Sequence, residues 1–291
     1  MAFSGNTVMD TDRLSSLFTE IIRFAFKSGR YYPRLATRVA VWIFTKPKRR
    51  KADESERRWL ASANSYFVPF RKGRLAVMEW GKGPAILCVH GWSGYGLRFS
   101  RLVEPLIHAG YRIILFDAPA HGRSSGSHLD FMDYREAILA VADKVGPLYG
   151  IIAHSFGAGA CLYAFEKGLK ADKVIFVSAL NGMRGPINYL AEMLQIPEKI
   201  FANTKLVFER KFNRTIESLE ALLVIPQLKT PPLLIFHDRD DPIIPHHNAL
   251  DLLRVWKDAQ LIDTPGGHED ILVTPQFIRE TTSFLKNSTD H

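Results

Sequence analysis

Apolar residues recur at two different spacings along the chain, and the change of spacing divides it into segments. Residues 12–28 place leucine, isoleucine, phenylalanine and alanine at helical spacing, and Asp12 stands where a helix cap is expected. A second helix is expected after Pro33. The polar run over 46–56 breaks the apolar pattern and is interpreted as a solvated linker. The pattern therefore predicts an N-terminal helical extension and basic linker over residues 1–60.

From residue 61 onward, short β-rich apolar runs alternate with helical stretches. This alternation is typical of a mostly parallel central sheet flanked by helices on both faces. The predicted strands are 74–80, 85–90, 112–117, 149–154, 173–179, 232–237 and 260–264. In such sheets the ligand crevice lies beyond the carboxyl ends of the strands, so the residues that follow each run are the candidates for chemistry.

One connection in this alternation is much longer than the others. About 50 residues rich in helix formers separate the fifth and sixth of these strands, whereas 2 to 6 residues are usual. We interpret residues 181–230 as a small helical cap. The core domain is then expected over 61–180 and 231–291.

A predicted strand, a serine and a predicted helix follow one another around Ser155. This is the context of a nucleophile elbow, in which a sharp turn holds the serine hydroxyl above the sheet. Small residues two positions to either side let strand and helix approach, and here they are Ala153 and Gly157. The usual pattern is G-x-S-x-G, so Ala153 departs from it by one methyl group.

A second serine matches the same pattern letter for letter. Ser124 is the central residue of Gly-Arg-Ser-Ser-Gly at 122–126. No strand runs directly into Ser124, and no apolar helix follows it. We therefore interpret this segment as turn residues after a strand.

A serine hydroxyl is a weak nucleophile at neutral pH and needs a base that is oriented by a third group. Two later strand ends supply candidates: Asp238, Asp240 and Asp241 follow one strand, and His268 follows another. The chain order of serine, acid and histidine differs from that of the unrelated serine-protease triads. On spacing alone, any of the three aspartates could be the acid.

Five motifs in order give the chain a resemblance to a known superfamily. They are HGWSG at 90–94, FDAPAHGRSSG at 116–126, AHSFGAG at 153–159, HDRDDPIIP at 237–245 and GGHEDIL at 266–272. Over residues 70–287 the chain resembles the α/β-hydrolase fold superfamily, in its serine esterase and lipase-like group. The resemblance implies that fold and assigns the catalytic triad to Ser155, Asp241 and His268, because Asp238 stands where the family usually has glycine.

The same resemblance places an oxyanion hole. Phe156 follows the nucleophile and is expected to supply one backbone N–H. The family's H-G-x motif implies that the backbone N–H of Trp92 is the second donor.

Other histidines and glycines do not indicate a cofactor. His90, His121 and His154 are interpreted as structural residues that hydrogen-bond nearby backbone. No pair of histidines has the spacing of a zinc site, and no G-x-G-x-x-G follows a strand, so neither a metal nor a dinucleotide is expected.

Length and composition indicate how large a core the protein can bury and in which compartment it is expected. A chain of 291 residues with 46% hydrophobic content can bury a large core. The two cysteines, Cys88 and Cys161, lie in apolar runs without metal or redox spacing, so a disulfide framework is not expected. No run reaches the roughly 18 to 20 apolar residues of a membrane span. A cytoplasmic protein is expected.

The net charge of +8 is concentrated at the N-terminus. Residues 1–75 contain 16 Lys+Arg against 6 Asp+Glu, or +10, which leaves 22 against 24, or −2, for the rest. These basic helices are interpreted as packed on the domain, and peripheral contact with an anionic membrane is the alternative. Nucleic-acid binding is not expected, because no recognisable reading element accompanies the charge. Nothing in the sequence indicates an oligomeric state.

The expected activity is hydrolysis of a small-molecule carboxylic ester through an acyl-enzyme. A thioesterase, an acyltransferase or a carbon–carbon bond hydrolase could use the same triad, because one fold hosts many chemistries. A binding protein that keeps the fold without turnover is the alternative from another class.

Overall fold

The structure is a computed structural model of the chain and describes residues 22, 26, 31–50 and 53–287. The helix expected over 12–28 lies outside the described residues except for Ile22 and Phe26, which are helical and buried. The chain divides into two compact units, and each is described by itself. The smaller takes in residues 1–45 and 184–217, and the larger takes in residues 46–183 and 218–291.

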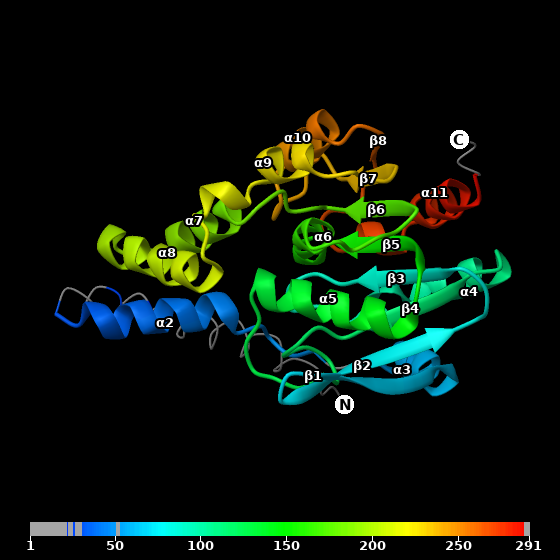
Figure 1. Cartoon of the computed structure of the whole chain (residues 1–291), viewed down its shortest axis with the longest axis horizontal. Coiled ribbons are helices and arrows are strands. Elements are labelled where there is room, and N and C mark those ends of the chain that lie inside the picture. Colours follow the sequence, from blue (N-terminus) through cyan, green and yellow to red (C-terminus); the bar gives the residue numbers. More distant parts are fainter. Residues whose placement is uncertain (1–21, 23–25, 27–30, 51–52, 288–291) are drawn as a thin grey trace, which may run out of the picture. The chain divides into compact units, whose positions relative to one another are not determined.

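A single sheet organises the larger unit. Among the described residues, eight strands pair in the order β1-β2-β4-β3-β5-β6-β7-β8 (Figure 1). The strands are β1 (Asn64–Phe70), β2 (Gly73–Trp80), β3 (Ala85–Val89), β4 (Arg112–Phe116), β5 (Leu148–His154), β6 (Lys173–Val177), β7 (Leu233–His237) and β8 (Ala259–Asp263). β2 pairs antiparallel with both β1 and β4, and every other pair in this order is parallel. The predicted mostly parallel sheet is confirmed.

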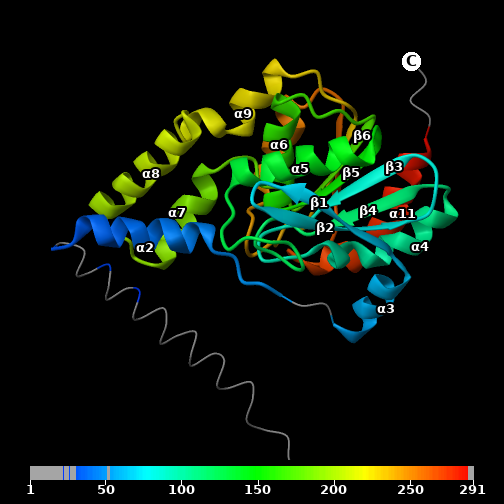
Figure 2. The ribbon, with the colours of Figure 1, turned by 60° about the horizontal axis from the view of Figure 1, so that its bottom comes forward.

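Helices cover both faces of this sheet. α5 and α6 pack together on one face, and α4 and α11 pack together on the other (Figures 1 and 2). Alternate strand residues such as Cys88 and Ile152 join Leu102 of α4 and Phe277 of α11 in one buried apolar cluster. The helices of this unit are α3 (Glu54–Ser62), α4 (Ser100–His108), α5 (Phe131–Val145), α6 (Phe156–Glu166), α9 (Ala221–Val224), α10 (His247–Val255) and α11 (Pro275–Lys286), with short 3-10 helices η1 (Gly96–Phe99), η3 (Ile225–Gln227) and η4 (Asp270–Val273).

All seven predicted strands are present, with ends that differ by one or two residues, but the sequence pattern missed β1. This strand lies at the edge of the sheet, and most of its residues are exposed or half-exposed. It also contains Pro69, which edge strands tolerate but which weakens a sequence-based strand prediction. A two-residue turn that includes Arg71, at φ 51°, returns the chain into β2.

The prediction of a solvated linker over 46–56 is wrong for the C-terminal part of that range. The Asp53 side chain accepts the Glu56 N–H at 2.9 Å, and the Glu56 carboxylate accepts the Asp53 N–H at 2.8 Å. This reciprocal capping box starts α3, and the spacing of acid and glutamate is its usual sequence signature. Glu56 is buried and also accepts the Tyr95 hydroxyl at 2.5 Å, which fixes the start of α3 to the larger unit.

The smaller unit joins segments that the sequence had assigned to separate domains. Its helices are α2 (Pro33–Thr45), α7 (Arg184–Met193) and α8 (Glu198–Phe212), and η2 (Glu217–Leu219) begins at its last residue. Ala36 and Ala40 of α2 share an apolar cluster with Ala191, Leu194 and Ile200, because small side chains let these helices approach closely. The N-terminal extension and the central part of the expected cap thus form one core.

Another side of α2 is exposed. Leu35 and Trp42 are 61% and 41% accessible to solvent. Peripheral membrane contact through the N-terminal helices stays a prediction. In the described part of the chain, no helix combines the length and the apolar character that crossing a bilayer requires.

Replacing the α3 cap tests its contribution to stability. We expect Asp53→Ala to lower the free energy of unfolding by about 1 kcal/mol, because the N–H of Glu56 loses its acceptor. Asp53→Asn keeps a capping oxygen and should stay within a few tenths of a kcal/mol of wild type. Urea denaturation measures both. Equal stability of the alanine variant and wild type would contradict this role.

Candidate active site

Ser155 occupies a strained turn between β5 and α6. Its backbone has φ 52° and ψ −119°, a region that non-glycine residues rarely adopt. The Ser155 N–H donates to the carbonyl of Val177 on β6 at 2.9 Å, which fixes the turn to the neighbouring strand. A Cβ added to Gly157 would lie 2.4 Å from the His90 carbonyl oxygen, so glycine is required there. Ala153 is fully buried within β5, where its methyl group is accommodated.

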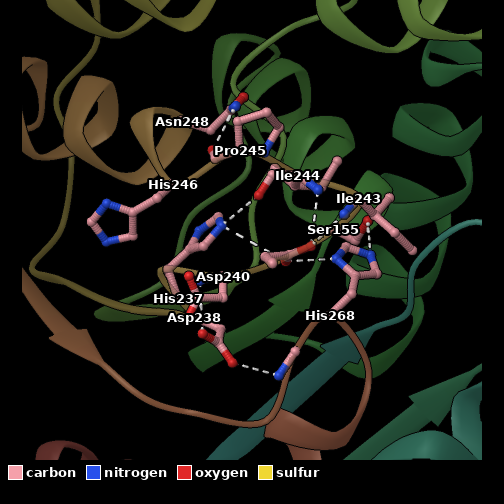
Figure 3. Close-up of polar contacts among 12 residues, drawn as sticks. Ser155, His237, Asp238, Asp240, Ile243, Ile244, Pro245, His246, Asn248 and His268 are labelled. Atoms are coloured by element: carbon pink, nitrogen blue, oxygen red, sulfur yellow. Dashed lines mark hydrogen bonds and ion pairs between the residues drawn. The ribbon is translucent and has the colours of Figure 1, made fainter.

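The structure brings together the three residues that the sequence assigned to the triad, of which Figure 3 labels Ser155 and His268. His268 Nε2 lies 3.0 Å from Ser155 Oγ, and His268 Nδ1 lies 2.9 Å from Asp241 Oδ2. An ionised carboxylate can only accept, so Nδ1 carries the proton and Nε2 is left to accept from the serine hydroxyl. The three side chains follow the ends of β5, β7 and β8.

Asp241 is held as a buried, ionised acceptor. Its side chain is fully buried, and its Oδ1 accepts the N–H groups of Ile243 and Ile244 at 2.8 and 2.9 Å. Burial by itself raises the pKa of Asp241, but the hydrogen bonds from His268 and Ile244 outweigh it and lower the pKa to about 2. Through these two contacts Asp241 caps a local turn and not a helix, since the next helix, α10, begins only at His247.

Asp238, one alternative to Asp241, has a different position. Its Oδ2 accepts the N–H groups of Gly266 and Gly267 at 2.8 and 2.6 Å, and its Oδ1 accepts the Asp240 N–H at 2.9 Å (Figure 3). The backbone N–H groups of Asp240 and Gly267 lower the pKa of Asp238, which keeps it charged. Asp238 thus fixes the turn that leads into His268, and Asp240 is exposed.

His154 holds the same turn from another side. It is buried next to Ser155, and its Nε2–H donates to the backbone carbonyl of His268 at 2.8 Å. Desolvation lowers the pKa of His154 to about 3, so the ring stays neutral at physiological pH. The sequence predicted a structural histidine here, which is confirmed, but not its contact with the residue that approaches Ser155.

Both residues expected to supply oxyanion donors lie close to Ser155. Phe156 is the first residue of α6, so its N–H has no acceptor within the helix. Trp92 lies in a turn closed by the Gly94 N–H, which donates to the Gly91 carbonyl at 3.1 Å. A Cβ placed on Gly91 would lie 3.1 Å from the Ser155 Cβ, so this turn passes directly beside the serine. The rings of Trp92 and Phe156 meet edge to face, with centroids 5.1 Å apart.

Comparison with known proteins identifies the fold family. Residues 84–225 match the family model described as alpha/beta hydrolase fold. A structure of an esterase from Exiguobacterium antarcticum superposes with a TM-score of 0.61 at 19% identity, covering 76% of this chain and 99% of that one. At this identity the likeness shows the fold alone. This chain has the α/β-hydrolase fold.

Curated relatives match parts of this α/β hydrolase. A serine hydrolase-like protein of Mus musculus is 25% identical over 147 residues, which are 46% of this chain and 47% of that protein. The 2-hydroxy-6-oxononadienedioate/2-hydroxy-6-oxononatrienedioate hydrolase 1 of Dechloromonas aromatica (strain RCB) is 30% identical over 145 residues, 44% of this chain and 48% of that protein. The chain spans about half the length of these two relatives.

The hydroxyl of Ser124, the alternative serine, stabilises the loop that contains it. Its hydroxyl donates to the Asp117 carbonyl at 2.5 Å and accepts the Ala76 N–H at 2.8 Å. Ser124 is 2% exposed, and both contacts lie inside the larger unit. The interpretation of this segment as structural turn residues is confirmed.

The remaining predicted structural histidines also bond backbone. His90 donates from Nδ1 to the Gly91 carbonyl at 2.8 Å and accepts the Ala118 N–H at Nε2 at 2.9 Å. His121 donates from Nδ1 to the Pro119 carbonyl at 2.9 Å. Desolvation lowers the pKa of His90 to about 4 and that of His121 to about 3. Within the described residues, no three His, Cys, Asp or Glu side chains are grouped as a metal site would require.

Removing the Asp238 carboxylate tests its effect on His268. We expect Asp238→Ala to lower kcat by about 10- to 100-fold, because a small displacement of a reacting group has effects of this size. Asp240→Ala is the matched control: it removes a neighbouring exposed carboxylate but keeps the N–H that Asp238 accepts. Steady-state kinetics measures both. The role would be refuted by equal kcat values in folded Asp238→Ala and Asp240→Ala.

The buried His154 makes the free energy of unfolding depend on pH in the acidic range. Its folded pKa is about 3 and its ordinary value is 6.5, so between these pH values the unfolded chain binds a proton that the folded chain does not. This contribution to stability is complete above pH 6.5 and is lost as the pH falls towards 3. His154→Gln keeps an N–H donor but never titrates. Between pH 6 and 4, we expect the free energy of unfolding of this variant to fall less steeply than that of wild type. The difference between the two slopes, measured by denaturant titration, should be about 1.4 kcal/mol per pH unit. Parallel slopes in variant and wild type would contradict a neutral buried ring.

Proposed function

We propose that this α/β hydrolase is a serine hydrolase that cleaves carboxylic esters through an acyl-enzyme intermediate. The observation that carries the proposal is the continuous hydrogen-bonded series from Ser155 Oγ through both nitrogens of His268 to Asp241. A hydroxyl that donates to a neutral imidazole, itself oriented by an ionised carboxylate, is the arrangement that activates serine for acyl transfer. Its substrate is a small-molecule ester.

The first half of the reaction forms the acyl-enzyme. Ser155 Oγ attacks the ester carbonyl carbon while His268 Nε2 takes the hydroxyl proton. The backbone N–H groups of Trp92 and Phe156 donate to the oxygen that becomes negative, where each such donor contributes about 2.7 to 4 kcal/mol. The C–O bond then breaks, and His268 gives its proton to the departing alcohol.

The second half regenerates the serine. Water attacks the acyl carbon while His268 Nε2 takes one of its protons, and the bond from the acyl carbon to Ser155 Oγ breaks with return of that proton to Oγ. Asp241 stabilises the imidazolium in both halves. Because its pKa is about 2, Asp241 stays charged at neutral pH.

A second candidate is cleavage of a carbon–carbon bond by the same residues. It is favoured by the relative from Dechloromonas aromatica, which is 30% identical over 145 residues and is named as a hydrolase of 2-hydroxy-6-oxononadienedioate and 2-hydroxy-6-oxononatrienedioate. Thioesterase and acyltransferase activities would also use this triad, with a thiol leaving group or an alcohol acceptor. A folded binding protein without turnover is the alternative outside catalysis.

The test is hydrolysis of p-nitrophenyl acetate and butyrate. We expect wild type to release p-nitrophenol and Ser155→Ala to lose about four orders of magnitude in kcat or more, because the nucleophile is gone. Ser124→Ala is the matched control and should keep kcat when folded. Equal inactivity of wild type and Ser155→Ala across acyl lengths would reject the esterase proposal. Turnover of a 2-hydroxy-6-oxo dienoate by such an inactive esterase would favour the second candidate.

A further inference from the structure

A short basic segment ahead of α3 is bound to the loops around Ser155. We call residues 48–50, Lys-Arg-Arg, the strap; they belong to the larger unit. Each strap residue makes a polar contact with a loop that follows β3, β4 or β8. The sequence pattern had assigned these residues to a solvated linker, and these contacts correct that interpretation.

Arg49 makes the most extensive of these contacts. Its Nη1 donates to the carbonyls of Gly122 at 2.6 Å, Ser124 at 2.8 Å and His121 at 3.3 Å, and its Nη2 donates to the Gly126 carbonyl at 3.1 Å. One guanidinium therefore binds four carbonyl oxygens of a single loop. Positive φ angles at Gly122, 41°, and Gly126, 102°, accompany the tight course of this loop.

This loop is connected to the turn that contains Trp92. The imidazole of His121 accepts the Ser93 N–H at Nε2, at 3.0 Å, and packs against the Trp92 ring with centroids 5.9 Å apart. Lys48 reaches the same turn directly, since its backbone N–H donates to Ser93 Oγ at 3.0 Å. Ser93 is thus held at its N–H through the loop that Arg49 binds, and at its hydroxyl by the strap itself.

Ser93 needs such support because its backbone is strained. Its φ is 54°, a conformation that costs a non-glycine residue free energy unless surrounding contacts determine it. The Ser93 N–H lies in the Trp92–Ser93 peptide plane, which adjoins the plane that contains the Trp92 N–H. Contacts that hold Ser93 therefore restrain the turn that carries this donor. An oxyanion donor must be aimed at the position of the developing charge before the reaction begins.

The strap also reaches the loop of the catalytic histidine. Arg50 lies 3.5 Å from the Glu269 carboxylate, and Arg98 lies 3.2 Å from it. Glu269 directly follows His268. These side chains are partly exposed, so this ion pair contributes little free energy. It shows that the strap continues towards the loop of His268.

From these contacts we propose that Lys48 and Arg49 are positioning residues of the oxyanion hole, and that the strap is part of the catalytic machinery. The proposal rests on the proposed function, because it assigns a role to the Trp92 N–H in acyl transfer. Arg49 acts through the loop at 121–126 and through His121, and Lys48 acts on Ser93 directly.

Arg49 is not the sole support of the loop at 121–126. The loop has other supports: the Asp117 carboxylate accepts the N–H groups of Gly96 and Arg123, each at 2.8 Å. The Ser124 hydroxyl also bonds Asp117 and Ala76. The loop should therefore keep its fold without Arg49. What we expect to change is the aim of the Trp92 N–H, which affects the transition state and not the binding of the ester.

The experiment compares Arg49→Ala with Arg279→Ala, which removes an exposed arginine from α11. For p-nitrophenyl butyrate we expect Arg49→Ala to lower kcat by about 10- to 100-fold, less than the loss of a whole donor, with KM within about two-fold of wild type. The rate at which a fluorophosphonate labels Ser155 should fall in parallel, because its phosphoryl oxygen uses the same donors. Arg279→Ala should match wild type in both.

Chemical rescue separates positioning from general damage. Arg49→Ala leaves four carbonyl oxygens without their cation, and the position is exposed, so free guanidinium ion can enter. Guanidinium well below denaturing concentrations should restore part of kcat to Arg49→Ala, whereas sodium chloride at equal ionic strength should not. Misfolding of the variant, or damage away from these carbonyls, would show no such recovery.

Ser93→Ala keeps the test independent of whether Arg49→Ala folds. It removes the acceptor for the Lys48 N–H while keeping a non-glycine residue, and it should lower kcat with KM little changed. Folded variants at both positions that equal wild type in kcat and in labelling rate would overturn the proposal. If wild type is not labelled at Ser155, the proposed function itself fails, and that result is distinguishable from equal labelling of wild type and variants.

Discussion

His268 accepts from a hydroxyl and donates to a carboxylate, and the rest of the site depends on its ability to do both at once. The 2.9 Å contact from Nδ1 to Asp241 fixes the tautomer, which leaves Nε2 to face Ser155 Oγ at 3.0 Å. An imidazole with the other tautomer would present a proton to the serine and could not act as its base. The two backbone N–H groups on Asp241 Oδ1 keep that carboxylate ionised and correctly turned.

The parallel sheet makes this geometry available. The carboxyl ends of β5, β7 and β8 lie at the same edge, so residues 113 positions apart in sequence reach hydrogen-bond distance. Local contacts then position the histidine: Asp238 holds the two glycines before His268, and His154 holds its carbonyl. The strap extends the same principle to the turn of Trp92, where long-range contacts support a strained residue.

The fold, Ser155 and His268 were predictable because their signals are local, whereas the choice of Asp241 over Asp238 and Asp240 came from the resemblance to the family. Each predicted strand is a short apolar run, and Ser155, Asp241 and His268 each follow one of these runs. β1 was missed because edge exposure and a proline remove the apolar pattern. The association of α2 with α7 and α8 depends on packing between segments about 150 residues apart, which no local pattern encodes. The strap was missed for a related reason, since a run of lysine and arginine indicates solvent exposure unless the carbonyls that bind it are known.

The central claim is that Ser155 is the hydroxyl activated by His268. Its most direct test is reaction of the folded protein with a fluorophosphonate, followed by mass spectrometry of the labelled peptide. The account predicts a label on Ser155, and a labelling rate that falls by orders of magnitude in His268→Ala. A label on Ser124, or equal labelling rates in wild type and His268→Ala, would contradict it.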